Sequence, residues 1–168
     1  VVFSSLKDLS ERIDDPDLDV AEDDVLVLRN AGPKGAPGMP ESGYIPIPKK
    51  LAQSGVKDMV RISDARMSGT AFGTIVLHIC PESYIGGPLS LVRNGDRIVL
   101  DVRKRRLDLE VDDKILEERK KDWVAPAPAS GSERGYLRIH LEQVEQASEG
   151  CDLAVLKVPQ TGVSTPIL

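Results

Sequence analysis

Short apolar runs separated by polar segments rich in glycine and proline characterise this chain of 168 residues. The runs at residues 25–28, 58–62 and 74–79 have the length and composition of buried strands. The last run would also suit a buried helix beginning at Gly69, although its β-branched residues favour a strand. The pattern therefore predicts short buried strands in the first half of the chain.

Apolar and polar residues alternate in three later segments, at residues 89–92, 97–102 and 107–111, as they do in half-buried strands. Between the first two segments, Asn94 and Gly95 are a strong signal for a tight hairpin turn. Residues 104–106 form a charged turn between the second and the third segment. These features predict strands that are connected mostly by hairpins.

Helical spacing or capping signals mark four other segments. Ser5 and Asp8 have the spacing of a capping box at the start of the first helix. Asp112 or Asp113 caps a surface helix whose basic residues follow its acidic ones, in agreement with the helix dipole. Gly150 is a plausible C-cap of the last helix. The four predicted helices lie within residues 4–13, 46–54, 112–123 and 137–147.

Together these elements predict one mixed α/β domain over residues 1–168, barrel-like, with short hairpin-connected strands and flanking helices. A doubly wound parallel sheet is not expected, because strands and helices do not alternate regularly. Residues 1–20 and 153–168 carry no recognisable motif, and we expect them to be peripheral. The chain begins with Val1 rather than Met, which suggests a domain of a longer protein.

Charge and cysteine content limit the classes of function. A net charge of −5 without a basic stripe argues against nucleic acid as the main partner. No apolar run reaches the roughly 18 residues that a membrane span needs, and no signal peptide is recognisable. Cys80 and Cys151 cannot form a disulfide framework, so we expect a reducing, cytoplasmic location.

Two polar loops rich in glycine, at residues 30–41 and 63–74, carry the candidate chemistry. The first contains glycine and proline too often to form a helix or a strand. It matches neither a phosphate-binding P-loop nor a dinucleotide-binding fingerprint. We expect the two loops to meet and to build half of an active site whose other half lies outside this chain.

Glu41 closes the first loop, and a carboxylate on rigid backbone suits a hard cation such as Mg²⁺. One carboxylate does not make a metal site, so a solvated loop acid is the alternative interpretation. In the second loop, Ser68 and Thr70 could present hydroxyls to one ligand, and Arg66 could bind a substrate carboxylate while Asp64 holds it. The alternative is a polar turn that satisfies its own backbone.

A hydrolytic triad is the other use that Ser68 could have. Its only histidine partners would be His78 and His140, and the G-x-S-x-G elbow is absent. His78 lies in an apolar run and is interpreted as a core or interface histidine, and His140 belongs to an amphipathic helix. Cys80 and Cys151 are interpreted as small buried residues that lack the spacing of metal or cluster ligands. A serine hydrolase is therefore disfavoured.

Four blocks of the sequence, in order, closely resemble the C-terminal part of the dihydroxy-acid/6-phosphogluconate/sugar-acid dehydratase family. The likeness covers roughly residues 25–155, which is far more specific than a short motif. The blocks are N-A-G-P-K-G-A-P-G-M-P-E (residues 30–41), V-K-D-M-V-R-I-S-D-A-R-M-S-G-T-A-F-G-T (56–74), H-I-C-P-E-S-Y-I-G-G-P-L-S-L-V-R-N-G-D-R-I (78–98) and R-G-Y-L-R-I-H-L-E-Q-V-E-Q-A-S-E-G-C-D (134–152).

The resemblance implies a hydro-lyase that removes water from a 2,3-dihydroxy acid and releases a 2-keto acid. It implies an iron–sulfur cluster, expected to be of the 2Fe–2S type, and Mg²⁺. Most of their ligands would come from a large N-terminal domain, which would be this domain's partner in an enzyme that assembles as a homo-oligomer. The C-terminal domain of the family is a swivelling β/β/α barrel. Because the cluster and most of the Mg²⁺ ligands would lie on the other domain, the isolated chain is expected to be inactive.

The resemblance also assigns roles to residues of the two loops. Glu41 matches the Mg²⁺ ligand, Ser68 the base that takes the C2 proton as an alkoxide, and Thr70 a neighbour that contacts substrate or orients the serine. The A-R-M-S-G-T-A-F-G-T stretch is more similar to the arabonate/xylonate branch. Ser42 and Gly43 depart from the family, in which a bulky apolar residue often follows the glutamate. The alternatives are a dihydroxy-acid dehydratase of branched-chain amino-acid biosynthesis and a non-catalytic homologue.

Overall fold

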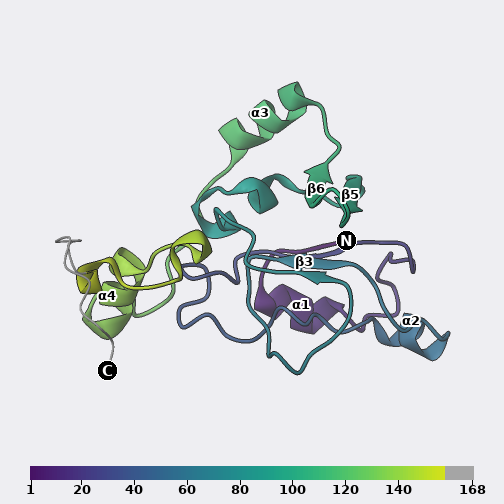
Figure 1. Cartoon of the computed structure of the whole chain (residues 1–168), viewed down its shortest axis with the longest axis horizontal. Coiled ribbons are helices and arrows are strands. Elements are labelled where there is room, and N and C mark those ends of the chain that lie inside the picture. The colour runs from purple at the N-terminus through teal and green to yellow at the C-terminus, as the bar shows by residue number, and fades with distance from the viewer. Residues whose placement is uncertain (158–168) are drawn as a thin grey trace.

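The computed structural model describes residues 1–157 and is a layered arrangement of short strands and helices (Figure 1). The strands are β1 (Val2–Phe3), β2 (Leu26–Leu28), β3 (Arg61–Ser63), β4 (Ile75–Val76), β5 (Ile98–Asp101) and β6 (Arg106–Leu109). The α-helices are α1 (Leu6–Arg12), α2 (Lys49–Gln53), α3 (Asp113–Asp122) and α4 (Gly135–Gln143). The 3₁₀ helices are η1 (Ser83–Ile85), η2 (Pro88–Leu91), η3 (Ala147–Glu149) and η4 (Ala154–Leu156).

The first four strands form a parallel sheet in the order β1-β2-β3-β4. The prediction that strands are mostly connected by hairpins is wrong for this sheet. Parallel neighbours need long crossover connections, and α1, α2 and the two glycine-rich loops occupy those connections. The mixed α/β class with flanking helices is confirmed, whereas closure into a barrel stays a prediction.

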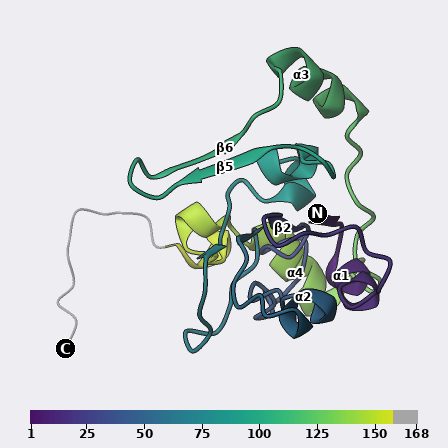
Figure 2. The ribbon, with the colours of Figure 1, turned by 90° about the vertical axis from the view of Figure 1, so that its right-hand side faces the viewer.

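The two faces of the parallel sheet pack against different layers (Figures 1 and 2). Phe3, Leu26 and Leu28 face a core to which α1 contributes Leu9 and Ile13. Because side chains alternate along a strand, the residues between them face the other way, toward the β5–β6 hairpin. The sheet is therefore buried on both faces, as its uninterrupted apolar runs predict.

The second face is covered by an antiparallel hairpin of β5 and β6 and by η2. The strand predicted at residues 89–92 is wrong, because these residues overlap a 3₁₀ helix that places Leu89 and Val92 against the sheet. Residues three apart share one face of a 3₁₀ helix, so both apolar side chains are buried. Asn94 and Gly95 accordingly turn the chain after a helix, so the hairpin predicted at these residues is wrong. The hairpin turn lies at residues 102–105, which overlap the charged turn predicted at 104–106, and Arg106 already belongs to β6.

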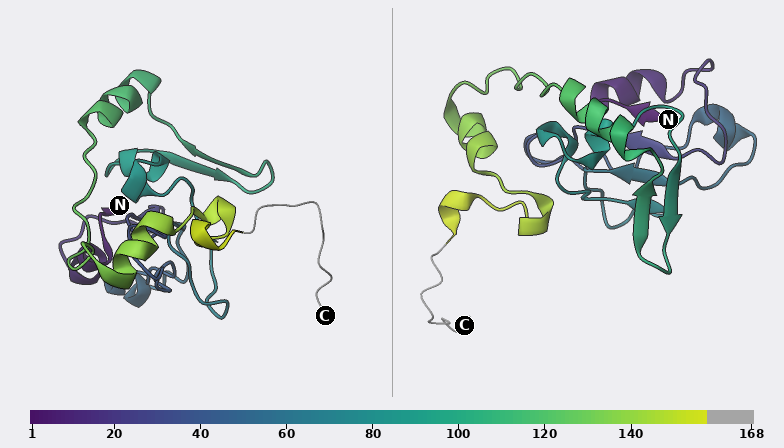
Figure 3. Two further views of the ribbon diagram at one scale, coloured as in Figure 1. Left: turned by 90° about the vertical axis from the view of Figure 1, so that its left-hand side faces the viewer. Right: turned by 90° about the horizontal axis from the view of Figure 1, so that it is seen from above.

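The helices begin largely as the capping signals predict. Ser5 is the N-cap of α1, and its Oγ accepts a hydrogen bond from the backbone N–H of Asp8 at 3.1 Å. Asp112 caps α3 through the N–H of Lys114. The last helix ends at Gln143, earlier than predicted, because Val144 forms a β-bridge with Leu153. Figure 3 shows the extended segment that connects α3 with α4.

The N-terminal residues are not peripheral, contrary to the expectation for residues 1–20. Val2 and Phe3 form the outer strand of the parallel sheet, and Phe3 is completely buried. Of the C-terminal segment expected to be peripheral, residues 153–157 are largely exposed and the remainder lies outside the described residues. Within residues 1–157, no helix has the length and apolar character needed to cross a bilayer.

Candidate active site

The two glycine-rich loops follow β2 and β3, which are adjacent parallel strands. Loops that follow the carboxyl ends of parallel neighbours lie at the same edge of the sheet. The predicted meeting of the loops is confirmed by two short hydrogen bonds. Arg66 Nε donates to the carbonyl oxygen of Met39 at 2.6 Å, and the N–H of Gly43 donates to the carbonyl oxygen of Arg66 at 2.7 Å.

Glu41 and Arg66 form an ion pair across this contact. Nη1 of Arg66 lies 2.6 Å from Oε1 of Glu41, and the two side chains are 43% and 47% exposed, Arg66 first. The predicted partner of Arg66, Asp64, is wrong, because that carboxylate is buried elsewhere. The ion pair therefore joins the two loops, and part of each charged group remains accessible to solvent.

Ser63 and Asp64 are buried residues that organise the backbone at the base of the loops. Ser63 Oγ donates to the carbonyl oxygen of Leu28 at 3.0 Å. Asp64 accepts hydrogen bonds from the N–H of Ala31 at 3.0 Å and from the N–H and Oγ of Ser83 at 2.9 and 2.5 Å. Ser63 Oγ also accepts a hydrogen bond from the N–H of Ala65 at 3.0 Å, as a turn that satisfies its own backbone predicts, whereas the partners of Asp64 lie in other segments of the chain.

Ser68 and Thr70 lie at the exposed end of the second loop. Their hydroxyl oxygens are 2.9 Å apart, and the N–H of Thr70 also points at Ser68 Oγ at 3.4 Å. The serine oxygen thus has a side-chain and a backbone neighbour two residues away. Such a turn can hold one hydroxyl oriented while the other contacts a ligand.

Neither histidine is placed to act on Ser68. His78 is exposed, with a φ of 55°, so the prediction that it is a core residue is wrong, while its alternative, an interface residue, stays a prediction. His78 lies two residues beyond β4 (Ile75–Val76), and the apolar residues on either side of it are half-buried. His140 Nε2 instead lies 3.0 Å from the carbonyl oxygen of Pro33 in the first loop. These contacts provide no hydrolytic triad.

Glu82 is a buried residue of the site region that the sequence analysis missed. Its carboxylate accepts hydrogen bonds from the N–H groups of Lys34 and Gly35 at 2.9 to 3.1 Å and from Gln146 Nε2 at 2.7 Å. A side chain at Gly32 would collide with Glu82, so this glycine is required for close approach. In sequence Glu82 resembles any loop acid, and its partners lie far from it along the chain.

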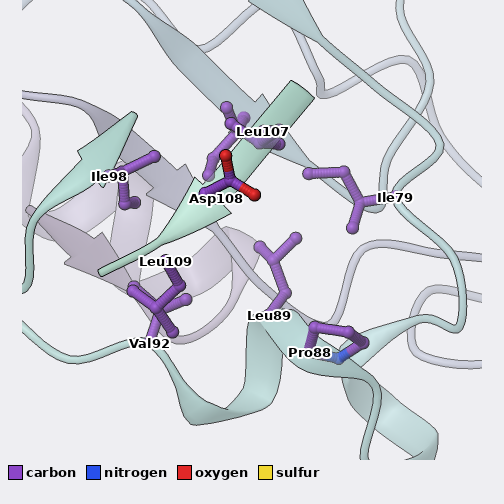
Figure 4. Close-up of a pocket in the computed structure, with 9 residues that line it drawn as sticks. Ile79, Pro88, Leu89, Val92, Ile98, Leu107, Asp108 and Leu109 are labelled. Atoms are coloured by element: carbon purple, nitrogen blue, oxygen red, sulfur yellow. The ribbon is translucent and has the colours of Figure 1, made fainter. Parts of the chain in front are cut away.

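An apolar pocket of about 210 Å³ lies between the parallel sheet and the hairpin (Figure 4). Leu89, Val92, Ile98 and Leu107 line it, and Asp108 is its one ionisable lining residue. No residue of the two glycine-rich loops contributes to the lining. The pocket is a packing gap between layers and not part of the candidate site.

The described residues of the candidate site offer one carboxylate ligand for a hard cation. Glu41 offers a partly exposed carboxylate, but residues 1–157 contain no group of three or more His, Cys, Asp or Glu side chains arranged to hold a metal. Any Mg²⁺ bound through Glu41 would need further oxygen ligands from outside these residues.

The same residues do not fit an iron–sulfur cluster, which usually requires four thiolates. Cys80 and Cys151 are half-buried free thiols rather than the fully buried residues expected. Burial, followed by the nearby charge of Glu82, raises the pKa of the Cys151 thiol. The thiol sulfur of Cys151 contacts the sulfur of Met39 at 3.6 Å, and that of Cys80 contacts Ser148 Oγ at 3.3 Å.

Comparison with known proteins agrees with the order-matched blocks. The family model described as "Dihydroxy-acid/6-phosphogluconate dehydratase C-terminal" matches residues 1–151. The chain is 48% identical over 167 residues to 6-deoxy-6-sulfo-D-gluconate dehydratase of Pseudomonas putida, covering 99% of the chain and 28% of that relative. It is 49% identical over 171 residues to L-arabonate dehydratase of Azospirillum brasilense, covering 99% of the chain and 29% of that relative.

A dihydroxy-acid dehydratase is a more distant relative. The mitochondrial dihydroxy-acid dehydratase of Saccharomyces cerevisiae (strain ATCC 204508 / S288c) is 39% identical over 152 residues, covering 90% of the chain and 26% of that relative. The chain thus spans between 26% and 29% of the length of these three relatives. The match over residues 1–151, together with the two loops at one edge of the sheet, assigns the chain to the dihydroxy-acid/6-phosphogluconate dehydratase C-terminal family.

Proposed function

We propose that this chain is the C-terminal domain of a dehydratase that converts a 2,3-dihydroxy sugar acid into a 2-keto-3-deoxy acid. The observation that carries the proposal is that one loop, residues 63–74, holds both Arg66, which pairs with Glu41 of the first loop at 2.6 Å, and the hydroxyl pair of Ser68 and Thr70. Identity of 48% and 49% to two sugar-acid dehydratases, against 39% to a dihydroxy-acid dehydratase, supports the sugar-acid substrate class.

Each exposed polar residue of the loops has a role in this proposal. Ser68 Oγ, as an alkoxide, takes the proton from C2 of the substrate, and Thr70 orients it through the 2.9 Å contact. Arg66 binds the substrate carboxylate through its planar guanidinium. Glu41 supplies an oxygen ligand to Mg²⁺. A serine hydroxyl is a poor base at its ordinary pKa, so the alkoxide requires nearby positive charge.

The proposed reaction eliminates water across C2 and C3 of the substrate. The C2–H bond breaks, and its proton moves to Ser68 Oγ. The electron pair forms the C2–C3 double bond as the C3–O bond breaks, and the departing hydroxide leaves as water after taking up a proton. The resulting enol gains a proton at C3, loses the proton of its C2 hydroxyl and becomes the 2-keto acid. Mg²⁺ supplies, when bound, the positive charge that such a developing carbanion and alkoxide require.

We propose that the iron–sulfur cluster of the family is bound outside this chain, in an N-terminal domain, because the two thiols described above do not suit it. That domain would also complete the ligand set of Mg²⁺ and cover the exposed end of the second loop. Catalysis would then require both domains, and the isolated chain would be inactive.

The test is Ser68→Ala in the protein at its full encoded length. Turnover of L-arabonate or D-xylonate should fall by about 10²- to 10⁴-fold, the usual contribution of a positioned base. Ser130→Ala, at an exposed serine in the loop between α3 and α4, is the matched control and should keep wild-type turnover.

Two results would contradict the proposal. Turnover by Ser68→Ala equal to that of the Ser130→Ala control would remove the serine from the role of base. Preference of the wild-type enzyme for 2,3-dihydroxyisovalerate over the aldonates would instead assign it to the dihydroxy-acid branch. Substrate loss and product formation would both be followed, since release of a 2-keto acid distinguishes dehydration from other losses.

A further inference from the structure

An ion pair at the base of both loops joins a buried arginine, Arg61, to an exposed aspartate, Asp58. Arg61, in the middle of the parallel sheet, is 1% exposed, and its Nη2 lies 2.6 Å from Oδ1 of Asp58. Burial removes the Arg61 guanidinium from water, which costs free energy, while its partner Asp58 stays 41% exposed. The pair therefore calls for an explanation other than stability.

The guanidinium of Arg61 contacts the chain that follows each loop. Nη1 donates to the carbonyl oxygens of Tyr44 at 3.0 Å and Ile45 at 3.4 Å, a few residues beyond Glu41. Nη2 donates to the carbonyl oxygen of Phe72 at 3.5 Å, two residues beyond Thr70. The guanidinium also lies 5.1 Å from the centre of the Tyr44 ring. One planar group thus joins the ends of both loops.

Asp58 holds the end of the second loop from the other side. Its carboxylate accepts hydrogen bonds from the N–H of Thr74 at 3.0 and 3.2 Å and from Thr74 Oγ1 at 2.7 Å. Desolvation opposes ionisation of this carboxyl, but the Thr74 hydrogen bonds and the charge of Arg61 outweigh it and lower the pKa. Asp58 is accordingly charged at neutral pH.

Gly73 leaves the space that this arrangement requires. Its φ is 118°, and a Cβ at this position would collide with Arg61 Nη2 and Asp58 Oδ1. Only glycine adopts this backbone conformation without strain, and only glycine has no side chain that would separate the ion pair. The turn after Phe72 is thus shaped around the pair.

We propose that Arg61 and Asp58 act as a positioning clamp that fixes Glu41 relative to Ser68 and Thr70. The inference rests on the proposed function of those three residues. Asp64 and Glu82 already fix the beginnings of the loops, through Ala31 and through Lys34 and Gly35. With the clamp, charged side chains hold each loop near both ends, so its exposed part has few alternative positions.

Guanidinium chemistry suits this role. Arginine presents donors in a fixed planar fork, so the angles between its partners are set together, which a lysine ammonium cannot do. Catalytic groups lose much of their effect when they are displaced by about 1 Å. Loosening the clamp should therefore lower turnover and weaken metal binding at Glu41, even though neither Arg61 nor Asp58 touches substrate.

The test is Asp58→Asn in the protein at its full encoded length, with Arg61→Lys as a second variant that keeps the charge but loses the planar fork. We expect kcat to fall by about 10- to 100-fold, with a smaller change in KM, and the Kd for Mn²⁺ to rise by about 10-fold. Mn²⁺ binding is followed by electron paramagnetic resonance, a readout that does not depend on turnover.

Asp96→Asn is the matched control. Asp96 pairs with Arg119 at 2.5 and 2.9 Å, and both side chains are more buried than Asp58, at 9% and 11% exposure. This pair connects α3 to the segment before β5 and contacts neither loop. Asp96→Asn should lower the melting temperature at least as much as Asp58→Asn, while kcat and the Mn²⁺ Kd stay within about twofold of wild type.

Different results would overturn the proposed function and the clamp. A wild-type protein without aldonate turnover, or one whose Mn²⁺ binding is insensitive to Glu41→Gln, would overturn the proposed function. If wild type behaves as proposed, kcat and Mn²⁺ Kd values for Asp58→Asn and Arg61→Lys that match those of Asp96→Asn would overturn the clamp. Larger losses of kcat and of Mn²⁺ affinity in both clamp variants than in Asp96→Asn, with an equal or smaller decrease in melting temperature, would support the clamp.

Discussion

At the scale of single residues, the ion pair between Glu41 and Arg66 is weak enough for each residue to bind another partner instead. Each is nearly half exposed, and such surface ion pairs contribute only about 0 to 1 kcal/mol to stability. Separating them therefore costs little, and the carboxylate becomes available to a cation while the guanidinium becomes available to an anion. The same separation would be far more costly for Arg61, which is buried.

Glu41→Gln should consequently weaken Mn²⁺ binding to the full-length protein by about 10-fold or more while it changes the free energy of unfolding by less than about 1 kcal/mol. Electron paramagnetic resonance titration and urea unfolding measure the two quantities. The control is Glu110→Gln, since Glu110 also forms an exposed ion pair, with Arg97 at 3.0 Å. Equal Mn²⁺ affinity in the two variants would remove Glu41 from the metal site.

At the scale of elements, local sequence signals predict how helices begin better than how strands pair. Ser5 caps α1 as its spacing predicts, because the partner of its hydroxyl is three residues away. The segment at residues 89–92 is a helix instead of a strand, because alternation over a few residues does not distinguish a 3₁₀ turn from an extended chain. Asn94 and Gly95 turn the chain in either case.

Ser5→Ala should lower the free energy of unfolding by about 1 kcal/mol, because the N–H of Asp8 loses its acceptor at the first turn of α1. Urea unfolding at neutral pH gives the difference. Ser10→Ala, at an exposed serine within the same helix, is the control and should be neutral or slightly stabilising, since alanine has the higher helix propensity. A loss in Ser10→Ala as large as that in Ser5→Ala would contradict capping.

At the scale of the whole molecule, helices, a parallel sheet and a hairpin form successive layers (Figure 2). An ion pair between side chains attaches α3 to the segment before β5. Arg119 of α3 binds both carboxylate oxygens of Asp96 and also donates to the carbonyl oxygen of Leu91. This contact involves no residue of the two glycine-rich loops. The site and the attachment of α3 can therefore be perturbed separately.

The Asp96–Arg119 pair makes stability depend on pH. Hydrogen bonds from Arg119 lower the pKa of Asp96 in the folded protein. A depressed pKa stabilises the folded state above the unfolded pKa, near pH 4, and this contribution is lost as pH falls toward the folded pKa. Urea unfolding from pH 6 down to pH 3 should show the difference between wild type and Asp96→Asn shrink below about pH 4. A difference that stays constant over this range would contradict the assignment.

The sequence by itself determined the family, the two loops, the helix caps and the short buried strands, because these depend on neighbours close along the chain or on long ordered blocks. Only the tertiary structure decided which hydroxyls and carboxylates of residues 63–74 are buried. Asp64 and Ser68 are four residues apart, yet Asp64 is enclosed by Ala31 and Ser83 while Ser68 is only half-buried. The parallel order of the sheet and the partners of Arg61 were likewise hidden, because burial and pairing are set by residues distant in sequence.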